Sequence, residues 1–318
     1  MISITRIDSP NAPGMDVFFH LGDAALRSSR SLFIAESPNV IQRALERGFE
    51  PVALLCEEGF PQREDGASLL ETLNAGANRK SGSPVIYSAA ADVLSAITGY
   101  HLTRGAICAF RRPVPTRTPF IEWQLETAPE SGLPRRIAVL DGIVDAANVG
   151  AIFRSAAALG AGAVLLTRTC CDPLNRRAIR ASMGAVFQIP WGWLEETPAT
   201  HRTPVADETP AHHRIPVAAE IPVAAEMPAA PEPLAVASLR KLGFRTVAMA
   251  LRSDSISLDS PVLAAEEHLA ILLGNEGQGL PEGEIAVADY VVRIPMQNGA
   301  DSLNVAAAAA IALWQLLK

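Results

Sequence analysis

The sequence predicts an α/β protein of two units, the second built on a mostly parallel sheet. Apolar runs of strand length alternate with helical patterns along the chain. The runs in the second unit are apolar almost throughout, as in strands that are covered on both faces. The chain has 318 residues, of which 49% are apolar, and this is enough for two cores of ordinary size.

The first third of the chain contains the elements of a small α/β unit. Four apolar runs are typical of strands, at 31–35, 51–56, 84–87 and 105–110. Two helical patterns lie between them, at 38–47 and 89–98. Pro38 suits the first turn of its helix, and Gly48 suits the end. We therefore predict a domain over residues 1–113, followed by a Pro/Thr-rich linker at 114–133.

Residues 134–318 predict a second, larger domain. Its expected strands are 137–140, 163–167, 186–189, 245–251, 268–273 and 290–295. Its expected helices are 148–159, 174–183, 234–242, 282–288 and 302–317. Strands that alternate with helices in this way favour a parallel sheet with helices on both faces.

One segment interrupts the second domain. Residues 197–232 consist of six hexads, each with a proline at its second position. Proline at this density excludes a helix or a central strand, so we expect an extended, solvated insertion. Its histidines are expected to be solvated rather than metal ligands. Tethering is the expected role, and docking of a partner is the alternative.

The net charge of −7 is concentrated in this insertion. Residues 195–232 hold seven acidic side chains against two arginines, a net charge of −5, which leaves −2 for the rest of the chain. A near-neutral body can still carry a basic face, so the acidic total does not exclude RNA binding.

The cysteines and the hydropathy of the chain indicate the cellular compartment in which the protein is expected. The four cysteines form no C-x-x-C pair, which predicts reduced thiols and no metal site. The N-terminus lacks the pattern of a secretory signal, and no apolar stretch reaches the roughly 18 residues of a membrane span. We expect a soluble, cytoplasmic protein.

Three clusters in the second domain carry the candidate chemistry. The first, Leu140–Arg154, runs from a strand through a loop into a helix expected to begin near Asn148. Gly150 and Arg154 are four residues apart and share a helix face. Arg154 is expected to extend back across the bare Gly150 toward the helix N-terminus, where anions are favoured. The alternatives are a helix cap for Asn148 and a surface ion pair for Arg154.

The second cluster, Leu272–Leu280, is a buried strand that enters a turn with three glycines around Glu276. Glycines allow the backbone to approach a ligand closely. The spacing G-x-x-G-x-G is not the dinucleotide fingerprint G-x-G-x-x-G, which argues against a dehydrogenase. An ordinary turn with a solvated Glu276 is the alternative.

The third cluster, Ile294–Val305, leads into an alanine-rich helix suited to close packing. Asp301 or Ser302 is expected to cap this helix, if these residues have no other role.

Taken together and in this order, the clusters closely resemble motifs 1, 2 and 3 of the SpoU (TrmH-like) RNA 2′-O-ribose methyltransferases of the SPOUT superfamily. The resemblance covers residues 135–318 apart from the hexads. The first domain resembles the small RNA substrate-binding domain that often precedes the catalytic one, through the stretch FIAESPNVIQRALERG. The loop at 145–147 departs from the pattern, because the family more usually has a proline and a glycine there.

The resemblance implies a trefoil-knotted sheet that binds S-adenosylmethionine, and a homodimer in which Arg154 works near the other subunit's cofactor. The implied catalytic residues are Asn148, Arg154, Glu276, Ser302 and Asn304. The implied cofactor-binding residues are Leu251, Gly274, Asn275, Gly277, Ile294, Met296 and Leu303. The implied reaction is methylation of a ribose 2′-hydroxyl in structured RNA, either rRNA or tRNA.

We expect Arg154 to stabilise the alkoxide that forms on the ribose, since a guanidinium holds its proton strongly. A role as general base is the alternative. RNA contacts are expected from arginine clusters, namely Arg111, Arg112, Arg135, Arg136, Arg176, Arg177 and Arg180. Trp191 and Trp193 are expected to pack in the core or in a dimer rather than to stack on bases. A catalytically inactive RNA-binding paralogue is the alternative function.

Overall fold

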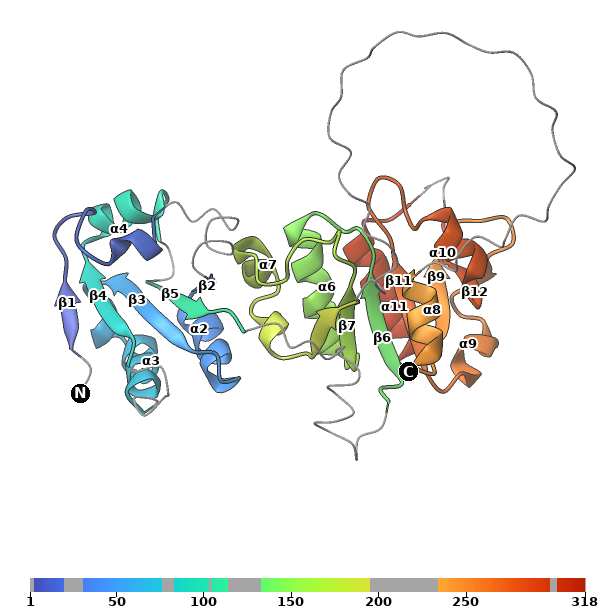
Figure 1. The fold of residues 1–318 in the computed structure, drawn as a ribbon, viewed down its shortest axis with the longest axis horizontal. Coiled ribbons are helices and arrows are strands. Elements are labelled where there is room, and N and C mark those ends of the chain that lie inside the picture. Colours follow the sequence, from blue (N-terminus) through green and yellow to red (C-terminus); the bar gives the residue numbers. More distant parts are fainter. Residues whose placement is uncertain are drawn as a thin grey trace, which may run out of the picture.

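The computed structural model describes residues 3–19, 31–75, 83–102, 105–113, 133–194, 234–297 and 302–317. These residues form two α/β units that lie side by side, each around its own sheet (Figure 1). The expected hexad insertion and nearly all of the expected linker lie outside them. The domain boundaries expected from the sequence stay predictions.

The N-terminal unit has a five-stranded sheet in the order β1-β4-β3-β5-β2. Its strands are β1 (Ile4–Arg6), β2 (Leu32–Glu36), β3 (Pro51–Glu57), β4 (Val85–Ala89) and β5 (Ala106–Arg111). Its helices are η1 (Met15–Val17), α2 (Pro38–Glu46), η2 (Phe60–Gln62), α3 (Glu64–Ala75) and α4 (Ala91–Thr98). β2 and β5 are antiparallel to each other, while β1, β4 and β3 are parallel. Apolar side chains of α2 and α3 pack on one face of the sheet, and those of η1 and α4 on the other.

The C-terminal unit has a seven-stranded sheet in the order β10-β12-β9-β11-β6-β7-β8. Its strands are β6 (Arg136–Leu140), β7 (Ala163–Leu166), β8 (Trp191–Trp193), β9 (Arg245–Met249), β10 (Ile256–Ser257), β11 (Leu269–Leu273) and β12 (Tyr290–Arg293). Its helices are α6 (Ala146–Leu159), α7 (Arg176–Ala181), η4 (Ala185–Phe187), α8 (Leu234–Lys241), α9 (Pro261–Ala265), α10 (Glu282–Val287) and α11 (Val305–Leu316). All its strand pairs are parallel, which confirms the predicted α/β class with a mostly parallel sheet.

The sheet of the C-terminal unit is covered on both faces, and its sequence pattern explains why. The side chains of β6 alternate between the faces: Ala138 and Leu140 join a cluster with α6 and α11, while Ile137 and Val139 join one with α8. All are fully buried. A strand that is buried on both faces needs an apolar run without polar interruption, and β6 and β11 have it. The trefoil knot implied by the resemblance stays a prediction.

One expected strand is wrong. Residues 186–189 are not a strand, because the chain turns through the 3-10 helix η4 just after Gly184, whose φ is +78°. Their apolar character comes from burial at the border of the two units rather than from a place in the sheet. The edge strand is β8, with Trp191 and Trp193. Six further elements in the described part of the chain were not predicted: β1, η1, η2, α3, β10 and α9.

Candidate active site

Asn148 joins the three sequence clusters through its side-chain amide. Its Nδ2 donates to Oε1 of Glu276 at 2.7 Å, and its Oδ1 accepts from Nδ2 of Asn304 at 3.0 Å. Asn148 lies in the first turn of α6, Glu276 in the turn after β11, and Asn304 just before α11. Residues that are far apart in the chain therefore meet at the carboxyl end of the parallel strands, where α/β folds place their ligands.

Asp145, not Asn148, caps α6. Its carboxylate accepts hydrogen bonds from the backbone of Ala147 at 2.7 Å and of Asn148 at 3.1 Å. The helix begins at Ala146, two residues earlier than expected. The capping alternative for Asn148 is therefore wrong, and its amide is available for Glu276 and Asn304.

Asn304 has two functions in the fold. Its Oδ1 accepts from the backbone of Ala306 at 3.0 Å and caps α11, while its Nδ2 donates to Asn148. The helix begins at Val305 with Asn304 as its cap, so Ser302 is not the cap, and Asp301 lies outside the described residues. The amide of Asn304 thus fixes the start of the last helix relative to the start of α6.

The glycine turn after β11 is closed by its own backbone and by Asn275. The backbones of Asn275 and Gly279 exchange hydrogen bonds at 3.1 and 2.8 Å. The side chain of Asn275 accepts from the backbone of Gly277 at 2.8 Å and donates to the carbonyl of Gly142 at 2.7 Å. A Cβ on Gly274 would lie 2.3 Å from the carbonyl carbon of Gly279, so only glycine permits this closure.

A cavity of about 560 Å³ opens beside this turn. Its walls come from the turn itself, the ends of β9, β11 and β12, and the start of α11. All seven residues expected to bind the cofactor line it, as do three of the expected catalytic residues, Glu276, Ser302 and Asn304. Asn148 touches this group through its hydrogen bonds, and Arg154 is not among the lining residues.

Several lining residues were not predicted as functional. Met249 and Ala250 come from the end of β9, Ala308 from the second turn of α11, and Arg293 from β12. For Met249, Ala250 and Arg293, the position near the carboxyl ends of predicted parallel strands was the available signal. A second feature was also missed: Oγ1 of Thr167 accepts from the backbone of Gly142 at 3.1 Å and donates to Asp141 at 2.9 Å. This bond holds the loop before α6 against the end of β7.

Arg154 is exposed on α6 and makes no hydrogen bond or ion pair within the described ranges. The expected reason for Gly150 is wrong. A Cβ on Gly150 would lie 2.4 Å from the carbonyl oxygen of Ala178 and 2.7 Å from Cβ of Ala181. The missing side chain therefore makes room for α7, which packs against α6, rather than for the side chain of Arg154.

The arginines expected to contact RNA are in three different environments. Arg112 and Arg176 form ion pairs at the border of the two units, with Asp172 at 2.9 Å and Glu36 at 3.2 Å. Arg111, Arg135, Arg177 and Arg180 are exposed. Arg136 is buried and donates to the backbone carbonyls of Leu316, Arg135, Glu267 and Leu263, so its expected role in RNA contact is wrong. Burial, and then the nearby Arg135, lower the pKa of Arg136.

The two tryptophans of β8 pack at the edge of the sheet. Trp191 lies edge-on to Phe153, with ring centroids 6.2 Å apart, and its Nε1 donates to the carbonyl of Val186. Trp193 lies against Trp191, and the guanidinium of Arg168 covers its ring at 5.1 Å. Both tryptophans border the apolar core, in agreement with the packing role expected for them.

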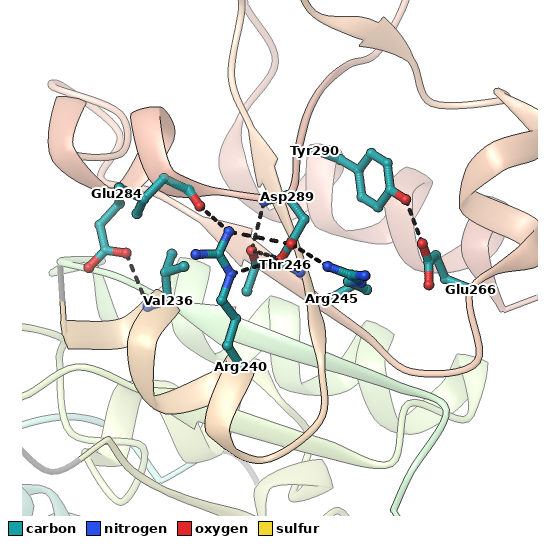
Figure 2. A network of polar contacts seen from close by, with 9 residues as sticks. Val236, Arg240, Arg245, Thr246, Glu266, Glu284, Asp289 and Tyr290 are labelled. Carbon is teal, nitrogen blue, oxygen red and sulfur yellow. Dashed lines mark hydrogen bonds and ion pairs between the residues drawn. The ribbon is translucent and has the colours of Figure 1, made fainter. Parts of the chain in front are cut away.

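A polar network closes the opposite, amino-terminal end of the strands (Figure 2). Asp289 accepts from the backbone and the hydroxyl of Thr246, at 2.9 and 2.7 Å, and from Arg240 and Arg245. Burial alone would raise the pKa of Asp289, but these hydrogen bonds outweigh it and lower the pKa to about 2. On a neighbouring helix, buried Glu284 accepts from the backbone of Ala235 and Val236 and so fixes the start of α8.

Comparison with known proteins agrees with the geometry. Residues 135–204 and 229–314 match the model of the SpoU rRNA methylase family. An uncharacterised tRNA/rRNA methyltransferase of Mycobacterium bovis is 33% identical over 320 residues, which cover 99% of this chain and 92% of the relative.

The chain belongs to the SpoU rRNA methylase family. A further relative is the 23S rRNA (guanosine(2553)-2′-O)-methyltransferase of Bacillus subtilis, 26% identical over 71% of this chain and 75% of its own length. Among solved structures, the AdoMet-bound rRNA methyltransferase of Sinorhizobium meliloti superposes with a TM-score of 0.70 over 98% of this chain and 97% of that one, at 20% identity. At this identity the likeness shows the fold alone. This SpoU protein therefore has the fold of that structure over both of its units. The match to the family model is interrupted at 205–228, which lies within the hexads.

Two further observations concern metal binding and membrane insertion. Within the described ranges, no group of His, Cys, Asp and Glu side chains could hold a metal ion. No helix in the same ranges has the length and apolar character needed to span a membrane.

Proposed function

We propose that this protein transfers the methyl group of S-adenosylmethionine to a ribose 2′-hydroxyl of structured RNA. The observation that carries the proposal is the contact of Asn148 with Glu276 and Asn304, which joins all three family clusters beside one cavity. The names of relatives support an RNA substrate, and the Bacillus subtilis relative is named as a 2′-O-methyltransferase of 23S rRNA. The attached N-terminal unit favours rRNA over tRNA.

The cavity fits the proposed cofactor in size and in chemistry. Its volume of about 560 Å³ is within the range of small-molecule sites, roughly 300–1,000 Å³. Leu251, Ile294, Met296 and Leu303 offer apolar contacts, and the closely approaching backbone of the turn at 274–279 offers polar ones. Glu276 provides a carboxylate at the same cavity, which suits a cationic sulfonium.

The protein's own residues would supply orientation and charge. S-adenosylmethionine, when bound, supplies a methyl group that its sulfonium has already activated. The ribose hydroxyl is a weak acid, so negative charge grows on its oxygen as the proton leaves. Arg154 would stabilise this charge and contact a phosphate, because a guanidinium is a strong donor that keeps its proton. Asn148 and Glu276 would hold the ribose and Arg154, while Ser302 and Asn304 would complete the pocket.

The proposed site needs a second copy of the chain. Arg154 is exposed on α6, and the cavity of its own chain has no wall from that part of the helix. α6 packs against α11, whose outer side exposes Ala307, Ile311 and Trp314. Ile311 is 40% exposed and Trp314 58%. Burial of these apolar side chains would stabilise a homodimer, which would bring Arg154 to the partner's cavity.

RNA contact is proposed for the exposed arginines Arg111, Arg177 and Arg180. Contacts between arginines and phosphates release counterions, so RNA affinity should fall steeply with added salt. Replacement of any one of them by glutamine should remove about one phosphate contact. The slope of log RNA affinity against log salt concentration should then become less steep by about 1.

Arg154→Ala tests the proposed reaction. The variant should lose methyl transfer by several orders of magnitude, on the order of 10³-fold, and keep its affinity for S-adenosylmethionine in calorimetry.

Mixed dimers test the assembly: Arg154→Ala chains joined to chains with a blocked cavity, such as Ala308→Trp, should regain one working site. Near-normal turnover by Arg154→Ala homodimers would refute the role of Arg154. Absence of both cofactor binding and transfer in the unaltered protein would favour an inactive RNA-binding paralogue.

A further inference from the structure

The two units share a buried apolar contact. Phe187, in η4 of the C-terminal unit, lies with its ring 5.7 Å from Phe33 and 5.1 Å from Phe49 of the N-terminal unit. Phe33 and Phe187 belong to one continuous cluster of buried side chains that extends through both units. Core continuity of this kind holds two units in one orientation, because relative motion would expose apolar surface.

Charged groups at the same border are paired and largely buried. Glu36 at the end of β2 accepts from Arg176 of α7 at 3.2 Å, and the two side chains are only 4% and 20% exposed. The guanidinium of Arg176 also lies 4.3 Å from the centre of the Tyr100 ring. A buried carboxylate without its partner is costly, so Glu36 favours the arrangement in which α7 is docked.

Two arginines at the end of α2, Arg43 in its last turn and Arg47 at its C-cap, bind backbone carbonyls that follow α7. Arg43 donates to the carbonyl of Met183, and Arg47 donates to that of Gln188 at 3.1 Å. Met183 has a φ of +53°, a left-handed conformation that is uncommon for a residue with a side chain. The N-terminal unit therefore supports the chain at the end of α7 as well as at its beginning.

α7 in turn supports the helix that bears the proposed catalytic residues. Gly150 of α6 lies so close to Ala178 and Ala181 of α7 that no Cβ would fit between them. The guanidinium of Arg177 lies 3.7 Å from the carboxylate of Asp145, which caps α6. A shift of α7 would thus be transmitted to the first three turns of α6, where Asn148 and Arg154 lie.

We infer that Glu36 is a positioning residue: by docking Arg176 it holds α7 against α6, and through α6 it sets Asn148 and Arg154. The N-terminal unit is then a fixed part of the catalytic framework, in addition to its proposed contact with RNA. The inference rests on the proposed function for the roles of Asn148 and Arg154. The residues that line the cofactor cavity come from β9, β11, β12, the turn after β11 and α11, so a shift of α6 should affect turnover more than cofactor binding.

Glu36→Gln tests the inference, with Glu58→Gln as its matched control. Glu58 also pairs with an arginine, Arg6 at 3.1 Å, but that pair is exposed and lies within the N-terminal unit. Hydrogen exchange should become about tenfold faster in α7 and in residues 146–150 of Glu36→Gln, and should not change there in Glu58→Gln. Turnover should fall about tenfold in Glu36→Gln, while KM for S-adenosylmethionine and its binding stay within about twofold.

Faster exchange confined to the N-terminal unit, or normal turnover by folded Glu36→Gln, would overturn the inference. If Glu36→Gln does not fold, Phe187→Leu replaces it with the same expected outcomes, because it loosens the border without leaving a charge unpaired. Should the unaltered protein transfer no methyl group at all, the proposed function fails. The exchange rates in α6 still decide whether Glu36 positions that helix.

Discussion

The side-chain amide of Asn148 donates to Glu276 at 2.7 Å, across 128 residues of sequence. Asn148→Ala removes this bond and the one from Asn304 together. We expect turnover to fall about 100-fold, because both partners lose the group that joins them at the proposed active site. Cofactor affinity should change little, since Asn148 is not among the residues that line the cavity.

Methyl transfer to rRNA under saturating cofactor measures the effect of Asn148→Ala. Asn39→Ala serves as the control, because Asn39 is exposed on α2 in the other unit. Equal losses in the two variants would show that Asn148 has no special part in the reaction.

Gly150→Ala should destabilise the protein by about 2 kcal/mol, because overpacking forces helices apart. The added Cβ would lie 2.4 Å from the carbonyl oxygen of Ala178, which is backbone and cannot rotate away. Gly59→Ala is the control, since its φ is −77° and a Cβ there meets nothing within 4 Å. Urea unfolding at neutral pH measures both. Equal stability of the two variants would contradict the packing assigned to α6 and α7.

The lowered pKa of Asp289 leads us to predict that the protein loses stability in acid. Its pKa is about 2 in the folded protein, against the usual 3.8. The ionised group therefore contributes its full stabilisation above pH 4, and the contribution is lost as the pH falls through about 2. A shift of this size corresponds to about 2 kcal/mol.

Urea unfolding of the protein and of Asp289→Asn between pH 6 and pH 2 measures this contribution. The difference between them should be about 2 kcal/mol at pH 6 and should shrink toward pH 2. A difference that stays constant over this range would mean that the charge of Asp289 contributes nothing.

The hexad insertion should tolerate shortening. Removal of residues 203–226 deletes four of the six hexads. Loop-closure entropy changes slowly with length, so the free energy of unfolding should change by about 1 kcal/mol or less. Thermal unfolding and calorimetry with S-adenosylmethionine measure the result. A large loss of cofactor affinity in the shortened protein would indicate that the hexads do more than tether.

The alternation of strands and helices was sufficient to predict the α/β class, because buried parallel strands leave apolar runs that stand out from helical patterns. β6 and β11 are such runs, and the motif residues that follow β11 line the cavity. The error at 186–189 has the same origin: the apolar run there is buried by Phe33 and Phe49 of the other unit rather than by a sheet.

Long-range contacts could not be predicted from local pattern. Arg111 and Arg112 are neighbours in the sequence, but Arg112 pairs with Asp172 at the border of the units while Arg111 is exposed. The close packing of α7 against Gly150 could not be predicted either. The sequence of a helix does not show whether its glycine faces a ligand or another helix.

Identification of the methylated product tests the central claim most directly. The purified protein is incubated with rRNA and S-adenosylmethionine labelled in its methyl group, and the RNA is then digested to nucleosides and separated by mass. We predict that the label appears in 2′-O-methylnucleosides, which leave alkali-resistant dinucleotides in the RNA. Label found only on a base, or no transfer to any rRNA or tRNA by protein that binds the cofactor, would contradict it.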